Sequence, residues 1–208
     1  MFYAVRKGAA PVWQLAIAGF FALLPIVTGG RYTHSRAKSH ALSFLRGRTQ
    51  QDMDDLARSF FRDRIMKRLY PLGAAELNRL RAEGYRILFV SASPDVYMRV
   101  LPEFLPADAV IATPCGLDND NRYTGLVGEN CKGIDKPLRI AEYLAANHLE
   151  LDWEHSRAYG DSPSDAPMLA LVATPICVNP AKSLRDQLPT ATIVTWKRGA
   201  LHPNVAPR

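Results

Sequence analysis

The chain has 208 residues, 48% of them hydrophobic and 22% charged, which is typical of one globular domain, or one domain with an insert, that can bury a full core. The net charge of +6 is unevenly spread: residues 1–70 carry 12 Lys and Arg against 4 Asp and Glu, and the rest carry 14 against 16. This basic first third could meet phosphate esters or anionic lipid, but no nucleic-acid-binding motif accompanies it, so we exclude nucleic acid as a partner.

The three cysteines, Cys115, Cys131 and Cys177, are an odd number and have no metal-ligand spacing. Reduced thiols in a cytosolic protein fit this usage best, and the apolar run around Cys177 is typical of a core position. We therefore predict a cytoplasmic protein with reduced cysteines.

Residues 8–30 contain no charged side chain. The stretch is long enough to span a bilayer, and the two basic residues before it are typical of a signal peptide. Gln14, Gly19 and Pro25 interrupt the apolar run, however, and the rest of the chain is typical of a cytosolic enzyme. These features favour a packed helix, or a helix at a membrane surface with peripheral contact through residues 8–30, over a true span.

The first third is predicted to be helical throughout, and Thr49 is the expected N-cap of its longest helix. Glycines and a proline mark the expected helix ends. The predicted helices are 35–47, ending at Gly47; 49–70, ending before Pro71; and 74–83, ending at Gly84. We assign residues 1–72 to a helical cap region and residues 73–208 to an α/β core.

The pattern changes in the core, where short apolar runs alternate with helical stretches. This alternation predicts a parallel sheet wound with helices. The segments 115–117 and 123–127 flank a turn-rich stretch and predict a β-hairpin at about 115–127. The other predicted strands are 86–90, 109–112, 155–159, 174–178 and 192–195, and a helix is expected from about 95 to 101 and from 133 to about 146.

Three polar groups follow predicted strands or begin predicted helices. Asp161 and Asp165 follow the strand at 155–159, at the sheet edge where open α/β folds bind ligands, and hard carboxylate oxygens suit Mg²⁺. The alternative, that Asp165 or Ser164 only caps backbone amides, is equally compatible with the residues. Ser91 ends the strand at 86–90, where a hydroxyl and free amides, such as that of Ala92, could hold phosphate, although simple capping of the next helix is an alternative.

Lys136 lies at a predicted helix N-terminus, where a cation is unfavourable unless an anion lies nearby. Together, a hydroxyl, a lysine and an Asp pair in this order would form a phosphoryl-transfer pocket.

Three segments, ILFVSASPD (87–95), TGLVGENCKGIDK (124–136) and YGDSPSDAPML (159–169), resemble the haloacid dehalogenase (HAD) superfamily, and within it the phosphoserine-phosphatase-like subfamily IB with a helical cap. The resemblance covers nearly the whole chain and implies a Rossmann-like fold and a Mg²⁺-dependent phosphatase acting on a phosphate monoester. It implies that Ser91 and Lys136 are catalytic, that Asp161 and its supporting carboxylate Asp165 hold the metal, and that substrate is bound by Ser91, Ala92, Ser164 and Asn179.

One family element is missing from the sequence: the apolar first strand that ends in Asp-x-Asp, whose first Asp attacks phosphorus and whose second is the general acid and base. Asp118-Asn119-Asp120 and Asp52-Met53-Asp54 match the letters but follow no strand. The missing strand would be central, flanked by the strands of Ser91 and Asp161. We expect an N-terminally truncated phosphatase. The alternatives are an inactive phospho-ligand-binding pseudoenzyme and a membrane-associated lipid phosphatase of the phosphatidylglycerophosphatase type, so the substrate is a small-molecule or lipid phosphate monoester.

Overall fold

The computed structural model describes residues 2–10 and 34–199, and these residues form two compact units. The first unit is drawn from residues 1–67, 92–104 and 112–130, and the second from residues 68–91, 105–111 and 131–208. Most of the charge-free stretch 8–30 lies outside the described residues. Among the residues that are described, no helix is long and apolar enough to cross a membrane.

The first unit consists of short helices and one antiparallel hairpin. Its elements are α1 (Phe2–Arg6), α3 (His34–Ala41), η1 (Ser43–Leu45), α4 (Gln50–Phe60), η2 (Phe61–Ile65), α6 (Asp95–Met98), η4 (Leu101–Glu103), β3 (Cys115–Leu117) and β4 (Tyr123–Val127). Thr49 is the N-cap of α4, as predicted, and forms a capping box with Asp52. The predicted hairpin is also confirmed, since β3 and β4 pair antiparallel around the turn at Asp118.

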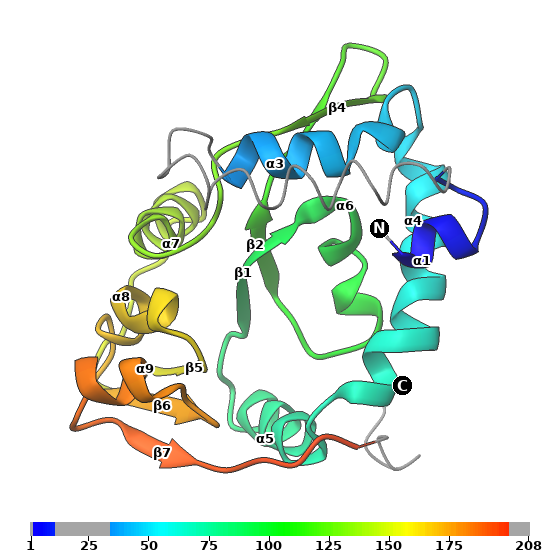
Figure 1. Ribbon diagram of the computed structural model, residues 1–208. Helices are drawn as coiled ribbons and strands as arrows, with labels where there is room; N and C mark the ends of the chain where they lie inside the picture. The colour runs from blue at the N-terminus through cyan, green and yellow to red at the C-terminus, as the bar shows by residue number, and fades with distance from the viewer. Residues whose placement is uncertain (1, 11–33, 200–208) are drawn as a thin grey trace. The chain divides into compact units, whose positions relative to one another are not determined.

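The hairpin packs against the N-terminal helices. Figure 1 shows β4 lying along α3, and the amide of Val127 donates to Ser39 Oγ at 2.9 Å. Tyr123 and Val127 are buried in one apolar cluster with Leu45 and Met53. The hairpin therefore belongs to the same unit as the N-terminal helices, because its apolar face is buried against them and not against the parallel strands.

The second unit contains the parallel strands. Its elements are α5 (Pro71–Ala82), α7 (Asp135–Ala146), β5 (Arg157–Gly160), η5 (Pro163–Asp165), α8 (Ala166–Leu169), β6 (Thr174–Val178), α9 (Lys182–Gln187) and β7 (Thr192–Val194). Strands β5, β6 and β7 form a parallel sheet in that order. Its small core contains Leu169, Cys177 and Leu184, and the burial of Cys177 agrees with its predicted core position.

Two further strands, β1 (Leu88–Pro94) and β2 (Ala109–Thr113), form a separate two-stranded sheet (Figure 1). Each begins in the second unit and ends in the first. In the part of the chain that the structure describes, β1 pairs with β2 and β5 with β6, and no strand lies on the other side of either. The α/β architecture with parallel strands and flanking helices is as predicted.

Several predicted boundaries differ from the structure. Strand β1 continues through Ser91 to Pro94, so Ser91 lies within the strand and not in a turn after it. The reason is Pro94, because a residue that precedes proline is driven to extended backbone. The next helix is correspondingly shorter than predicted, from Asp95 to Met98. The first predicted helix ends early, at Ala41, and a short 3₁₀ turn follows it, while Pro71 begins α5 and does not merely end the helix before it.

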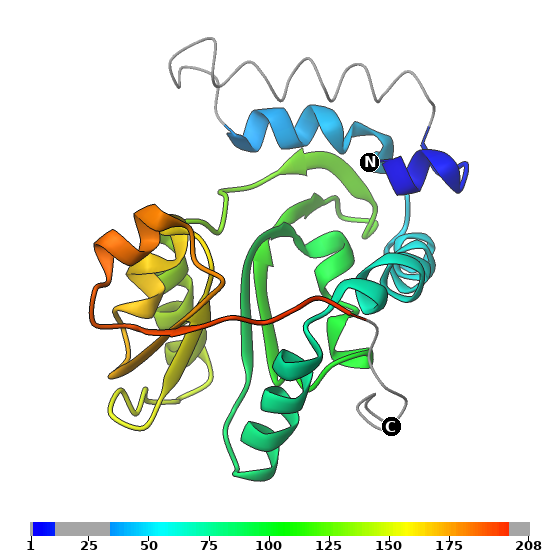
Figure 2. The same ribbon diagram turned by 60° about the horizontal axis from the view of Figure 1, so that its bottom comes forward.

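The segment after β7 is extended and leads back to the start of α5 (Figure 2). The amide of Gly199 donates to the carbonyl of Leu69 at 3.0 Å, and the ring of Trp196 lies 6.0 Å from that of Tyr70. The ring of Trp196 also stacks with that of Tyr159 of β5, with 6.1 Å between the ring centroids. These contacts fix the last described residues against the same unit as the sheet.

Candidate active site

The site is centred on a buried ion pair between Lys136 and Asp165. Lys136 is the second residue of α7 and Asp165 is the last residue of η5, and each is 6% exposed. Lys136 Nζ donates to Asp165 Oδ1 at 2.6 Å. The anion that Lys136 requires at a helix N-terminus is therefore present in the protein itself.

The second carboxylate oxygen of Asp165 binds the turn that follows β5. Asp165 Oδ2 accepts hydrogen bonds from the amide of Ser162 at 3.1 Å, from Ser162 Oγ at 3.0 Å and from the amide of Asp161 at 3.3 Å. Burial alone raises the pKa of Asp165, but Lys136 and the Ser162 donors stabilise the charged form more strongly, so the pKa of Asp165 lies below its ordinary value. Asp165 thus both caps the turn and binds the lysine.

Gly160 allows this arrangement by its size. A Cβ at Gly160 would lie 2.7 Å from the Cβ of Asp165, closer than real side chains approach. Gly160 is not among the glycines with positive φ, so unusual backbone angles do not explain the glycine at this position. The strand end needs a glycine so that Asp165 can approach the backbone of β5 closely.

Lys136 also reaches strand β1. Its Nζ donates to the carbonyl of Val90 at 3.0 Å, one residue before Ser91. A single ammonium group therefore joins the strand that carries Ser91 to the turn that carries Asp161 and Asp165. This contact brings Ser91, Lys136 and the two carboxylate residues to the same end of the parallel strands within one unit.

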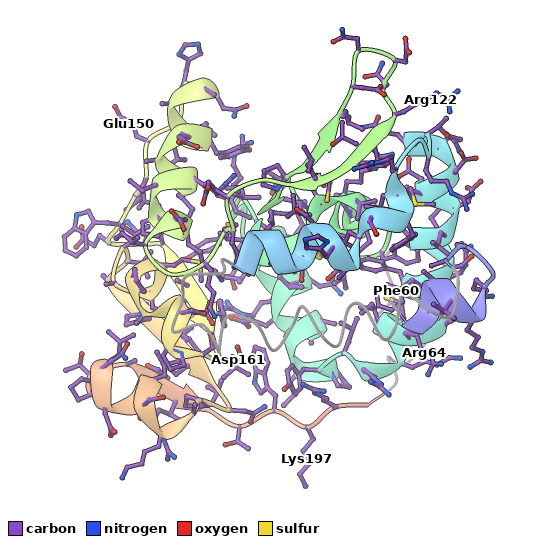
Figure 3. All side chains as sticks on the ribbon, turned by 45° about the horizontal axis from the view of Figure 1, so that its top comes forward. Phe60, Arg64, Arg122, Glu150, Asp161 and Lys197 are labelled. Atoms are coloured by element: carbon purple, nitrogen blue, oxygen red, sulfur yellow. The ribbon has the colours of Figure 1, made fainter. Side chains whose placement is uncertain are left out.

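Asp161 differs from Asp165 in being exposed. It follows the last residue of β5 (Figure 3), and its carboxylate makes no hydrogen bond to another described side chain. Its charge acts on Tyr70 and Arg198, which lie nearby. Arg198 Nε points to the hydroxyl of Tyr70 at 3.4 Å, and this contact lowers the pKa of Tyr70 below its ordinary value.

The chemistry of a metal site is only partly present. Within the described ranges, no group of three or more His, Cys, Asp or Glu side chains could hold a metal ion. Asp161 offers a free carboxylate of the hard type that Mg²⁺ prefers, whereas both oxygens of Asp165 are already bound by Lys136 and Ser162. The residue types present suit Mg²⁺, and Asp161 is the carboxylate that could bind it directly.

The remaining predicted residues have structural partners. Ser164 Oγ shares a hydrogen bond of 2.7 Å with Ser162 Oγ, and the Ser164 carbonyl accepts from the amide of Gly133 at 3.1 Å. Asn179 binds the backbone of Trp196 through both ends of its amide, at 2.8 and 3.0 Å. The carbonyl of Ala92 accepts from Lys38 Nζ at 2.5 Å and from Thr113 Oγ1 at 2.9 Å. A ligand at Asn179 would have to compete with the Trp196 backbone.

Sequence reasoning missed Tyr70 and Arg198 near Asp161. Neither belongs to a motif, and they are separated by more than half of the chain, so no spacing could have indicated them. The one signal was the series of aromatic residues beside basic ones, and this is too common on protein surfaces to single out a site.

A family model described as haloacid dehalogenase-like hydrolase matches residues 1–170. Among curated proteins, Protein CicA of Caulobacter vibrioides is 30% identical over 167 residues, which cover 78% of this chain and 72% of CicA. Phosphoserine phosphatase SerB1 of Mycobacterium tuberculosis is 28% identical over 148 residues, which cover 70% of this chain and 47% of SerB1.

Solved structures with the same fold include a Bordetella pertussis protein of unknown function, with a TM-score of 0.79, 24% identity and coverage of 92% of this chain and 87% of that one. A phospho-aspartyl intermediate analogue of phosphoserine phosphatase has a TM-score of 0.56 and 18% identity, over 89% of this chain and 85% of that one. At these identities the likeness concerns the fold.

Proposed function

The chain belongs to the haloacid dehalogenase-like hydrolase family. We propose that it is an N-terminally truncated form of a Mg²⁺-dependent phosphatase that acts on a small phosphate monoester. The observation that carries this proposal is the buried Lys136–Asp165 pair, which lies beside Ser91 at the strand ends. Burying a lysine with one carboxylate and one carbonyl is costly for stability alone, and a role in charge neutralisation explains it. The names of SerB1 and of the phosphoserine phosphatase structure support a phosphate ester as the substrate.

Each residue has a chemical task in this proposal. Ser91 Oγ and the amide of Ala92 hold the phosphate oxygens, and Lys136 neutralises the charge that develops on them. Asp165 keeps the ammonium of Lys136 in place, and Asp161 would hold Mg²⁺, which supplies further positive charge next to the phosphate. Ser164 and Asn179 stay candidate substrate contacts.

The nucleophile must come from outside the two Asp-x-Asp matches within the chain. The side chain of Asp118 accepts hydrogen bonds from the amides of Asp120 and Arg122 in the hairpin turn. The Asp52 carboxylate accepts from the Thr49 amide in the capping box of α4, and Asp54 pairs with Arg99. These acids have structural tasks in the first unit. We therefore propose that the nucleophilic Asp lies on an apolar strand encoded upstream of residue 1.

The reaction then has two steps. The upstream carboxylate forms a bond to phosphorus while the ester P–O bond breaks, and the alcohol leaves with a proton from the second Asp of Asp-x-Asp. Water, deprotonated by that same Asp, attacks the phospho-aspartate, which releases inorganic phosphate and restores the carboxylate. In both steps Lys136 and Ser91 contact the phosphoryl oxygens and transfer no proton.

The test uses the chain extended in frame upstream of residue 1, with p-nitrophenyl phosphate as substrate. We expect Mg²⁺-dependent hydrolysis that EDTA abolishes, and no hydrolysis by residues 1–208. Lys136→Ala in the extended chain should reduce kcat by at least about a hundredfold. Lys132→Ala is the matched control, since Lys132 is exposed just before α7, and it should leave kcat unchanged.

Two results would contradict this proposal. Hydrolysis by residues 1–208 that requires Lys136 would show that the nucleophile lies within the chain. An upstream reading frame that stops before any Asp-x-Asp, together with orthophosphate binding by residues 1–208, would favour the second candidate, a protein that binds phosphorylated ligands without hydrolysing them.

A further inference from the structure

The extended segment 195–199, here called the strap, is fixed on both sides of Arg198 within the second unit (Figure 2). Before Arg198, the side-chain amide of Asn179 binds the Trp196 backbone through both of its ends, at 2.8 and 3.0 Å. After Arg198, the amide of Gly199 donates at 3.0 Å to a backbone carbonyl two residues before α5. The backbone of Arg198 is therefore held between two anchors, although the residue itself is exposed.

The side chain of Arg198 is oriented by Tyr70, the N-cap residue of α5. Arg198 Nε donates to the Tyr70 hydroxyl at 3.4 Å, and the guanidinium lies 5.6 Å from the centroid of the Tyr70 ring. The hydrogen bond leaves the two terminal nitrogens of the guanidinium available. Arg81 of the same unit pairs with Asp108 at 2.7 Å, whereas Arg198 forms no ion pair with any residue that the structure describes. A planar fork of donors is thus positioned without an anion among these residues.

Arg198 lies at the carboxyl end of the parallel strands. Asp161 directly follows β5, and Trp196 of the strap stacks with Tyr159 near the end of that strand. The pKa of Arg198 lies above its ordinary value, mainly because of Tyr70 and also because of the negative charge of Asp161. The guanidinium therefore lies at the strand end that also carries the buried lysine of the proposed phosphate site.

Lys197, the neighbouring cation of the strap, faces the other way. Side chains alternate between the two sides of an extended chain, so Lys197 and Arg198 point in opposite directions. Figure 3 shows the Lys197 side chain leaving the ribbon away from Asp161. The strap thus presents Arg198, and not both of its cations, to the side of Asp161.

We propose that Arg198, oriented by Tyr70, binds a second anionic group on the alcohol part of the substrate. The substrate class is a phosphate monoester that carries a carboxylate or a second phosphate, since both present the paired oxygens that a guanidinium fork binds. This inference rests on the proposed function, in which Lys136 serves the phosphoryl group and a further anion requires another cation. Arg198 lies beyond residues 1–170, which the family model matches, so the resemblance assigns it no role.

The test compares two aryl phosphates that differ only in their second group. One is 4-carboxyphenyl phosphate, and the other is 4-carbamoylphenyl phosphate, which has a similar shape without the second charge. Calorimetry with Mg²⁺ present measures the binding of each to residues 1–208. We expect the native protein to bind the carboxylate about tenfold more tightly than the amide, and Arg198→Ala to reduce this ratio to about one. The affinity for 1,4-phenylene bisphosphate shows whether a carboxylate or a second phosphate is the better anion.

The matched control is Lys197→Ala, which removes the adjacent cation that points away from Asp161 and should leave the ratio near its native value. Arg198→Lys keeps the charge without the planar fork and should retain only part of the preference. Tyr70→Phe keeps the ring without the hydroxyl, and it should lower the ratio less than Arg198→Ala does. A native ratio of one, or equal losses in Lys197→Ala and Arg198→Ala, would overturn the inference, because the protein would then have no preference or only a general attraction for anions.

Kinetics of the chain extended upstream separate this inference from the proposed function. In that chain, Arg198→Ala should raise KM for the carboxylate ester about tenfold relative to KM for the amide ester. If both esters are hydrolysed and Arg198→Ala leaves the ratio of their KM values unchanged, the anion site is wrong and the proposed function stands. If neither ester is hydrolysed but the charged ligand still binds through Arg198, the proposed function is wrong and the anion site stands.

Discussion

Two turns of this protein share one sequence pattern, a hydroxyl residue followed three positions later by aspartate. In the first unit, Thr49 begins α4 and Asp52 reaches back to the Thr49 amide at 3.3 Å and to its hydroxyl at 2.8 Å. In the second unit, Ser162 begins η5 and Asp165 reaches back in the same way, at 3.1 and 3.0 Å. Both are capping boxes, so the local backbone chemistry of the two turns is the same.

The two aspartates differ in their surroundings. Asp52 is exposed and its carboxylate serves the helix start. Asp165 is 6% exposed. Its Oδ1, which takes no part in the capping box, accepts a hydrogen bond from the buried Lys136. The difference shows that capping and ion pairing are not alternatives, since one carboxylate does both. Local sequence determines the turn, and burial with a cation from α7 distinguishes the Asp165 turn from the Asp52 turn.

The largest expected effect comes from removing Lys136, the cation that pairs with Asp165 of the buried turn. Lys136→Ala leaves Asp165 buried without its partner, and we expect it to lower the free energy of unfolding by about 3–5 kcal/mol, measured by urea denaturation. Lys132→Ala, at an exposed position just before α7, should change the free energy of unfolding little. If Lys136→Ala alters stability no more than Lys132→Ala does, the buried turn is equivalent to the Thr49 turn.

Acid should lower the stability of the protein by protonating Asp165, the partner of Lys136. The pKa of Asp165 is lower in the folded protein than in the unfolded chain, so its contribution to stability is fully present above the unfolded value of about 3.9 and is lost as pH falls through the folded value. Urea denaturation between pH 3 and pH 7 should therefore show a steeper acid loss for the native protein than for Asp165→Asn. Equal slopes would mean that Asp165 is not charged in the folded protein.

Glu76 provides an internal reference for this measurement. Its hydrogen bond from Arg79 lowers its pKa to about 2, although burial acts in the opposite direction. Its contribution is also lost in acid, between about 4.5 and 2, and it persists in Asp165→Asn. The difference between the native and variant slopes therefore separates the contribution of Asp165 from that of Glu76, which is common to both proteins.

The comparison also explains what the sequence could predict. The hairpin at 115–127 and the Thr49 cap were predicted correctly because both depend on neighbouring residues. Lys136 was selected by its unfavourable position on α7 and by family resemblance, and the structure supplies its anion. The division into units was not predictable from local patterns, because it depends on which distant faces the hairpin covers. Tyr70 and Arg198 lacked any sequence signal near Asp161.

Gly160 is a steric requirement of the Ser162–Asp165 turn alone. Its substitution should have an intermediate effect on stability. A methyl group at Gly160 would meet Asp165 Cβ at 2.7 Å, so Gly160→Ala should displace Asp165 and cost about 1–3 kcal/mol of stability. Gly199→Ala is the matched control, because its nearest neighbour, Pro71 Cγ, lies at an ordinary 3.6 Å. Thermal unfolding of both variants measures the difference. If the two behave alike, the turn can move away from β5 without loss and close packing is not needed there.

The smallest expected effect belongs to the exposed turn, where Thr49→Ala removes the hydroxyl that accepts the Asp52 amide at 3.2 Å. Loss of an N-cap hydroxyl costs about 1 kcal/mol, and Thr49→Ser should restore it because serine caps equally well. Catalysis by the extended chain should be unaffected by either change, since the cap serves only the start of α4. The corresponding Ser162→Ala should cost similar stability but also lower kcat, because Ser162 helps to hold the carboxylate that binds Lys136. Equal effects of Thr49→Ala and Ser162→Ala on kcat would show that the second turn, like the first, serves the backbone alone.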